Sequence, residues 1–214
     1  IRVPAAFNGV WGHKPTWGVI PTEGHYFPGT DSARSVLSVL GPMARDADDL
    51  EAALDIVADH PLAPAKRHGD TWRVLILTSH PMARVQRSII AALERVANAL
   101  RETGATVDTS SDLLPDLERQ HAGYWQMLNI AMSRRAPRPE GQAAPELEPW
   151  LHLHDEQARN QRQWRRLFER YDAVIAPTVG MTAFPHDPTP LATRRLSIDG
   201  EDTQNVPAHL LRRR

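Results

Sequence analysis

The order of predicted elements assigns the chain to the α/β class, with a mixed, largely parallel sheet covered by helices. The apolar run RVLIL at 73–77 is typical of a short buried strand. Four apolar residues then recur at helical spacing and predict an amphipathic helix: Ile89, Leu93, Val96 and Leu100. Gly104 ends this helix as a C-cap, and residues 105–108 predict a second strand. A strand–helix–strand order of this kind predicts a right-handed crossover and a parallel pair.

The remaining elements continue the alternation of helices and strands. Asp46 precedes a periodic stretch that predicts a helix over 47–58, because its carboxylate can accept hydrogen bonds from the free N–H groups of the first turn. Apolar seams predict two longer helices over 113–133 and 150–170. A buried strand is expected over 173–176.

Three segments are expected to contain no long element. Glycine and proline punctuate residues 1–41, which favours extended segments and turns. The Pro/Arg/Gly stretch over 134–149 predicts an exposed loop. Residues 186–214 are expected to be irregular, because the chain is proline-rich and then polar there. We assign the whole chain, 1–214, to one domain.

The composition excludes several classes of function. The 214 residues are 41% hydrophobic and 24% charged, with a net charge of -1, so no overall field would recruit nucleic acid or an anionic membrane. No apolar run reaches the length of a membrane span. The chain has no cysteine, which excludes disulfides and thiolate chemistry and is compatible with a reducing compartment. We therefore expect a cytoplasmic protein with neither a nucleic-acid nor a membrane partner.

The opening segment carries the most specific motif. Ile1-Arg2, PAAF at 4–7 and KPT at 14–16 resemble a stretch of the amidase-signature family, in which the I-R pair follows the nucleophilic serine. Two later segments are similar to the next landmarks of that family, in the same order: GPMAR at 41–45 and YDAVIAPT at 171–178. Because three landmarks occur in order, the chain is identified as a member of this family.

The resemblance is narrower around His13 and Trp17, where the sequence is similar to bacterial amidases such as the A subunit of glutamyl-tRNA(Gln) amidotransferase. Membership of the family implies hydrolysis of a carboxamide by a Ser–Ser–Lys triad, in which a neutral lysine deprotonates a bridging serine that activates the nucleophile. It also implies a small-molecule amide substrate, no cofactor and no metal. A homodimer is compatible with the sequence.

The chain departs from the family pattern in the catalytic residues. The catalytic lysine, the bridging serine, the nucleophile and the glycine-rich oxyanion loop of the family all lie upstream of the position of Ile1. Lys14 and Lys66 are the only lysines, and Lys14 falls in the KPT position, which is not the catalytic one. The context of Ser32, Ser35 and Ser38 does not match either serine of the triad.

We therefore expect the chain to be the C-terminal portion of one amidase domain, with an incomplete amidase-signature fold and no catalytic residue of its own. The alternative is a non-catalytic remnant or interaction subunit, completed by a separate N-terminal half. The resemblance makes Ile1, Arg2, Val3 and Thr178 the candidate substrate-pocket residues, since the first three follow the nucleophile and Thr178 follows a strand at the end where open α/β sheets bind ligands.

Other patterns favour structural roles over binding. His152 and His154 could hold a metal from a strand, but on a helix the i and i+2 positions point apart. The arginines of 159–170 are interleaved with Glu156 and Glu169 in a chain of net charge -1, which is typical of a solvated helix face. Four aromatic residues of the opening segment could form a ligand platform, although packing over turns is more typical: Trp11, Trp17, Tyr26 and Phe27.

Overall fold

The computed structural model describes residues 1–26, 34, 37–63, 71–133, 146–189 and 193–204. The chain divides into two compact units. Unit 1 comprises Ile1–Lys66 and Ala122–Ala158, and unit 2 comprises Arg67–His121 and Arg159–Arg214.

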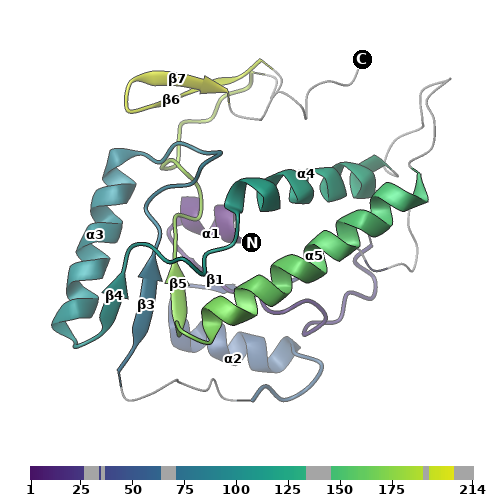
Figure 1. Ribbon diagram of the computed structural model, residues 1–214, viewed down its shortest axis with the longest axis horizontal. Coiled ribbons are helices and arrows are strands. Elements are labelled where there is room, and N and C mark those ends of the chain that lie inside the picture. Colours follow the sequence, from purple (N-terminus) through teal and green to yellow (C-terminus); the bar gives the residue numbers. More distant parts are fainter. Residues whose placement is uncertain (27–33, 35–36, 64–70, 134–145, 190–192, 205–214) are drawn as a thin grey trace. The chain divides into compact units, whose positions relative to one another are not determined.

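A parallel sheet of three strands forms the centre of unit 2 (Figure 1). The central strand β3 (Arg73–Ile76) pairs in parallel with β4 (Thr106–Asp108) on one side and with β5 (Ala173–Ile175) on the other. Helix α3 (Arg87–Glu102) connects β3 to β4. The predicted strand–helix–strand unit and its parallel pair are thus confirmed, and the fold class is α/β.

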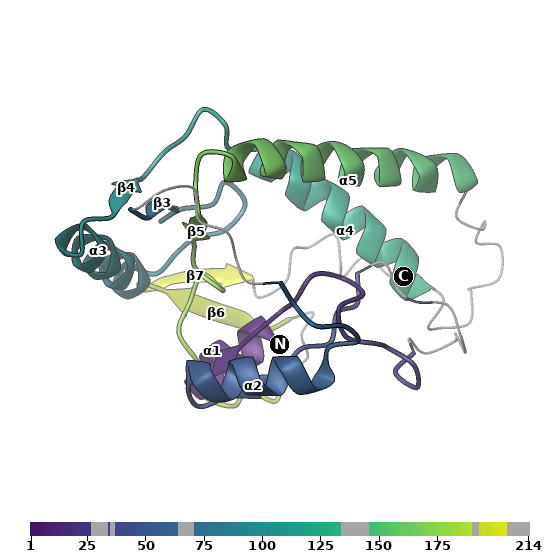
Figure 2. The same cartoon turned by 90° about the horizontal axis from the view of Figure 1, so that it is seen from below.

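Alternate side chains of β3 enter two separate apolar clusters, because successive residues of a strand point to opposite faces. Val74 and Ile76 pack with Leu93 and Ala97 of α3. Leu75 packs on the other face with two further fully buried side chains, Leu167 and Tyr171. Figure 2 shows α3 on one side of the sheet and the C-terminal end of α5 (Leu147–Phe168) on the other.

The buried face of α3 differs from the predicted one by a single position. Ala97 is buried, whereas Val96, which the apolar spacing had placed on the inner face, is 42% exposed. Val96 and Ala97 lie three and four residues beyond Leu93, so helix periodicity allows either on the inner face, and packing against Val74 and Ile76 buries Ala97. Gly104 has a φ of 87°, the left-handed conformation expected after the end of a helix.

A β-hairpin occupies part of the segment that was expected to be irregular. Strands β6 (Arg195–Ile198) and β7 (Glu201–Gln204) pair antiparallel. Asp199 and Gly200 connect them with φ values of 54° and 87°, as a two-residue hairpin turn requires. The expectation for 186–214 was wrong here, because Leu196 and Ile198 alternate with exposed residues and are buried on one face. Residues 190–192 and 205–214 lie outside the described part of the chain.

The first segment of unit 1, Ile1–Lys66, contains two short helices and one two-stranded antiparallel ladder within its described residues. Helix α1 (Arg2–Asn8) forms within the segment that was expected to be extended, and β1 (Trp11–Gly12) follows it. β1 pairs with β2 (Met43–Ala44). Helix α2 (Ala47–Val57) begins as predicted, since Asp46 Oδ1 accepts a hydrogen bond from the backbone N–H of Asp49 at 2.8 Å.

The two longest helices are close to their predicted bounds. Helix α4 (Leu117–Ser133) begins four residues later than expected, because Leu113 and Leu114 pack in an apolar cluster of unit 2 ahead of the helix. Helix α5 begins at Leu147, inside the predicted loop over 134–149, whose residues 134–145 lie outside the described part of the chain. None of the helices in the described residues is long and apolar enough to cross a membrane.

Candidate functional site

Three of the four candidate pocket residues lie at the start of α1. Ile1 is the N-cap residue of this helix, and its carbonyl oxygen accepts a hydrogen bond from the backbone N–H of Ala5 at 2.9 Å. The Ile1 side chain is half-buried, whereas Arg2 and Val3 are exposed. The local backbone is thus held by Ile1 and Ala5, while the next two side chains are accessible to a ligand.

Close packing against two glycines holds Ile1 in place. A Cβ added at Gly12 would lie 2.8 Å from Ala5 Cβ and 3.2 Å from Ile1 Cγ2. A Cβ added at Gly41 would lie 2.0 Å from the carbonyl oxygen of His13 and 3.0 Å from Ile1 Cδ1. The start of α1 therefore depends on glycine at both positions.

The same region brings the first two family-like landmarks into direct contact. Trp11 pairs with Ala44 in the β1–β2 ladder, and the backbone N–H of His13 donates to the carbonyl oxygen of Pro42 at 3.1 Å. The segments at 1–16 and 41–45 thus form one structural element, although about 25 residues separate them in the sequence.

Lys14 lies close enough to Arg2 for the two charges to interact. Partial burial, and after it repulsion from the Arg2 guanidinium, lowers the pKa of Lys14 from its ordinary value. Within the described residues no serine hydroxyl is hydrogen-bonded to Lys14. The described residues therefore offer this lysine no serine to activate.

The fourth candidate, Thr178, belongs to unit 2, where it is exposed in the loop that follows β5. Further along the loop, the backbone N–H of Gln86 donates to the carbonyl oxygen of Gly180 at 2.8 Å. The amide oxygen of Gln86 accepts hydrogen bonds from the backbone N–H and the hydroxyl of Thr182, both at 3.1 Å. Gln86 therefore fixes the loop after β5 to the segment that precedes α3.

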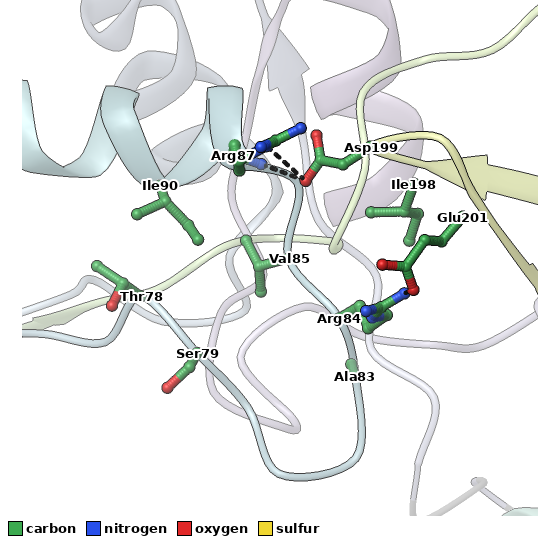
Figure 3. A pocket seen from close by; sticks show the side chains of 10 residues that line it. All are labelled: Thr78, Ser79, Ala83, Arg84, Val85, Arg87, Ile90, Ile198, Asp199 and Glu201. Carbon is green, nitrogen blue, oxygen red and sulfur yellow. Dashed lines mark hydrogen bonds and ion pairs between the residues drawn. The ribbon is translucent and has the colours of Figure 1, made fainter.

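Unit 2 also contains a pocket of about 460 Å³ at the carboxyl end of β3 (Figure 3). The segment after β3, the start of α3 and the β6–β7 hairpin line it: Thr78, Ser79, Ala83, Arg84, Val85, Arg87, Ile90, Ile198, Asp199 and Glu201. The strand order β4-β3-β5 means that the chain leaves β3 toward one neighbour and later returns to its other side. Sheets of this topology bind ligands beyond the strand ends at that point.

Two arginine–carboxylate pairs join the hairpin to the first residue of α3 and to the segment before that helix (Figure 3). Arg84 Nη1 donates to Glu201 Oε2, and this bond raises the pKa of Arg84 and lowers that of Glu201. Arg87 Nε lies 3.7 Å from Asp199 Oδ2, which also accepts the backbone N–H of Arg87 at 3.0 Å. Asp199 is partly buried, but the other three side chains are well exposed, so screening by solvent weakens the attraction.

No short sequence motif marks this pocket. Its arginines and its carboxylates lie more than 110 residues apart along the chain, and no short motif joins them. One usable signal was the Asp199-Gly200 dipeptide between alternating apolar residues, which is typical of a tight hairpin.

The residues weighed for other roles have structural contacts. His152 lies 3.7 Å from Glu156 one turn along α5, and the ring of His154 lies edge-on to Trp150. Within the described residues no group of three or more His, Cys, Asp or Glu side chains could hold a metal ion. Trp11 and Trp17 are about half-exposed, and Phe27 lies outside the described residues.

Comparison with known proteins supports the family. The Amidase family model matches residues 1–138, which is more than half of the chain. The chain is 29% identical to indoleacetamide hydrolase of Bradyrhizobium japonicum over 91% of its length and 47% of the relative. It is 26% identical to the A subunit of the glutamyl-tRNA(Gln) amidotransferase of Symbiobacterium thermophilum, over 86% of the chain and 47% of the relative. The chain thus spans about half the length of these relatives.

A shorter match and the solved structures agree with this assignment. The chain is 47% identical to human fatty-acid amide hydrolase 2 over 58 residues, which are 27% of the chain and 11% of the relative. A fatty acid amide hydrolase structure superposes with a TM-score of 0.68 at 22% identity, covering 86% of this chain and 38% of that one. An amidase crystal structure superposes with a TM-score of 0.60 at 21% identity, covering 96% of this chain and 48% of that one. These structures show the same α/β fold, and the chain belongs to the amidase family.

Proposed function

We propose that the chain is part of an amidase that hydrolyses the C–N bond of a small carboxamide, releasing a carboxylate and ammonia or an amine. The observation that carries this proposal is the family match over residues 1–138, which contains the α1 start and the β1–β2 ladder. The names of the relatives include an indoleacetamide hydrolase and a fatty-acid amide hydrolase. A carboxamide is the group that these two names share, and the acyl part of the substrate stays open.

In the proposed mechanism a Ser–Ser–Lys triad outside this chain performs the chemistry, and the nucleophilic serine is joined directly to Ile1. A serine hydroxyl attacks an amide only when an adjacent base removes its proton. Lys14 interacts with the charge of Arg2, and no described serine is hydrogen-bonded to it, so we assign it no catalytic part. The match of Ile1-Arg2 to the residues after the family nucleophile supports this position for the serine.

The proposed substrate contacts follow from the same position. Arg2 and Val3 are exposed beside the packed Ile1, and Arg2 carries a charge that could orient a polar substrate. We propose that Ile1, Arg2 and Val3 line the substrate pocket of the complete enzyme. Thr178, in the loop after β5 of unit 2, is proposed separately as a substrate contact. No cofactor enters this mechanism, since serine, lysine and backbone N–H groups supply the nucleophile, the base and oxyanion stabilisation.

The test compares two proteins, this chain and a longer one that includes the residues encoded upstream of Ile1. Ammonia release is measured with acetamide, benzamide and indole-3-acetamide. We expect turnover by the longer protein and none above background by the chain. If turnover requires mixing the chain with a separately encoded N-terminal half, the triad is supplied by another polypeptide. Turnover by the chain alone would contradict the proposed position of the triad.

A further inference from the structure

Both charged and apolar side chains line the pocket of unit 2 (Figure 3). Arg84 lies at the hairpin side, and the hydroxyls of Thr78 and Ser79 lie at the end of β3. The apolar side chains include Val85, Ile90 and Ile198, which are buried or half-buried. A volume of about 460 Å³ falls within the range of small-molecule sites, which are mostly apolar with a few placed polar groups.

The guanidinium of Arg84 already binds a carboxylate of the chain itself. Glu201 reaches Arg84 from the β7 strand, and both side chains are more than half exposed. A carboxylate from a ligand can make a two-pronged contact with the same guanidinium. Because Glu201 is largely solvated, breaking its ion pair with Arg84 costs little free energy. An apolar ligand tail would gain free energy by leaving water to contact Val85, Ile90 and Ile198.

We propose that this pocket binds a small aliphatic carboxylate, which displaces Glu201 from Arg84 and packs its tail against these apolar side chains. The pocket lies at the carboxyl end of β3, whose two neighbours β4 and β5 follow later in the chain on opposite sides. This position in the sheet supports a ligand site independently of the side chains. The second pair, Arg87 with Asp199, keeps the hairpin on α3 when Glu201 is released. The inference does not depend on amide hydrolysis, since it concerns binding in unit 2 alone.

The test is a titration of the ¹⁵N-labelled chain with sodium butyrate, followed by the amide shifts of Thr78, Ser79 and Glu201 at constant ionic strength. We expect saturable shifts with butyrate, weaker binding of acetate because its tail is shorter, and no saturation with inorganic phosphate. Glu201→Gln removes the internal competitor, so butyrate should bind about two- to fivefold more tightly, the factor that an exposed ion pair is worth. Arg84→Gln should abolish saturation.

Glu94→Gln is the matched control, because it removes the same charge from an exposed position of α3 that does not line the pocket. It should leave the butyrate affinity unchanged. Equal tightening by Glu94→Gln and Glu201→Gln would show general electrostatic attraction and overturn the proposal. So would an absence of saturable shifts in the unmodified chain, or equal affinities for butyrate and phosphate. The Glu201→Gln comparison decides the matter even if Arg84→Gln does not fold.

Discussion

Asp199 caps helix α3 from a distance of 112 residues in the sequence: its Oδ2 accepts the backbone N–H of Arg87 at 3.0 Å. The N-cap residue of this helix, Gln86, makes no side-chain capping bond. Its amide oxygen binds Thr182 instead. The hairpin turn therefore supplies the side-chain oxygen that a local Ser, Thr or Asp would normally provide. This bond links the β6–β7 hairpin to α3 of unit 2.

Replacement of Asp199 should separate capping from turn formation. Asp199→Ala loses the acceptor and places an alanine at a φ of 54°, so we expect a loss of about 2 kcal/mol in the free energy of unfolding. Asp199→Asn should lose less than half of this, because asparagine tolerates the left-handed conformation and its amide oxygen still accepts a hydrogen bond. Urea unfolding measures both. Equal losses for the two variants would contradict a capping role.

The buried hydroxyl of Tyr171 should be a second strong contributor to unit 2. Tyr171 is 1% exposed, and its hydroxyl donates to Asp108 Oδ2 at 2.8 Å, at the end of β4. Tyr171→Phe should destabilise the chain by about 1.5 kcal/mol, since the acceptor is a carboxylate. Tyr124→Phe is the control, because that side chain is 46% exposed, and it should change the urea midpoint little. If Tyr171→Phe left the free energy of unfolding unchanged, this contribution of the hydroxyl would be ruled out.

The sequence predicted β3, α3 and β4 of unit 2 well because their signals are local. The RVLIL run, the period of α3 and Gly104 each depend on neighbours within a few residues, and strand pairing in parallel follows from the crossover rule. The buried face of α3 was harder to predict. Val96 and Ala97 are both apolar and adjacent, so only the packing against Val74 and Ile76 determines which of them is buried.

Two glycine substitutions in unit 1 should have opposite effects. A Cβ at Gly41 would lie 2.0 Å from the carbonyl oxygen of His13, so Gly41→Ala should destabilise the chain by about 3 kcal/mol through displacement of the backbone near Ile1. Gly123 lies within α4, and apart from its chain neighbours and the backbone of its own helix no atom lies within 4 Å of an added Cβ. Gly123→Ala should therefore stabilise the chain by about 1 kcal/mol. Thermal unfolding of both variants checks the pair, and a harmless Gly41→Ala would contradict the close packing.

Stability should rise with pH where Lys14 titrates. Its pKa in the folded chain is below the ordinary 10.5, because of burial first and Arg2 second. Between the two pKa values the unfolded chain binds more protons, so the free energy of unfolding increases with pH in that window. Below this pH window, the full cost of holding a charged Lys14 in the folded chain lowers the free energy of unfolding. Lys14→Met should thus stabilise the chain at pH 7, and its advantage should vanish above pH 10.5. An advantage that persists unchanged at high pH would exclude this electrostatic cause.

The candidate pocket residues and the unit 2 pocket differ in how far the sequence could predict them. Ile1, Arg2 and Val3 were identified because a contiguous motif resembles a family, and that motif folds as one packed helix start. The Arg84–Glu201 and Arg87–Asp199 pairs bring together residues from opposite halves of the chain. Only the tertiary fold determines such pairs, because each arginine has many alternative carboxylates in a chain with 26 acidic residues.

Covalent labelling tests the central claim, that the amidase nucleophile is joined to Ile1, most directly. The longer protein that includes the upstream residues is treated with a serine-reactive fluorophosphonate, digested with trypsin and mapped by mass spectrometry. We predict one labelled peptide, which ends in Ile1-Arg2 and carries the label on the serine before Ile1. Labelling of Ser79 or of any other serine within this chain, or the absence of any label, would contradict the account.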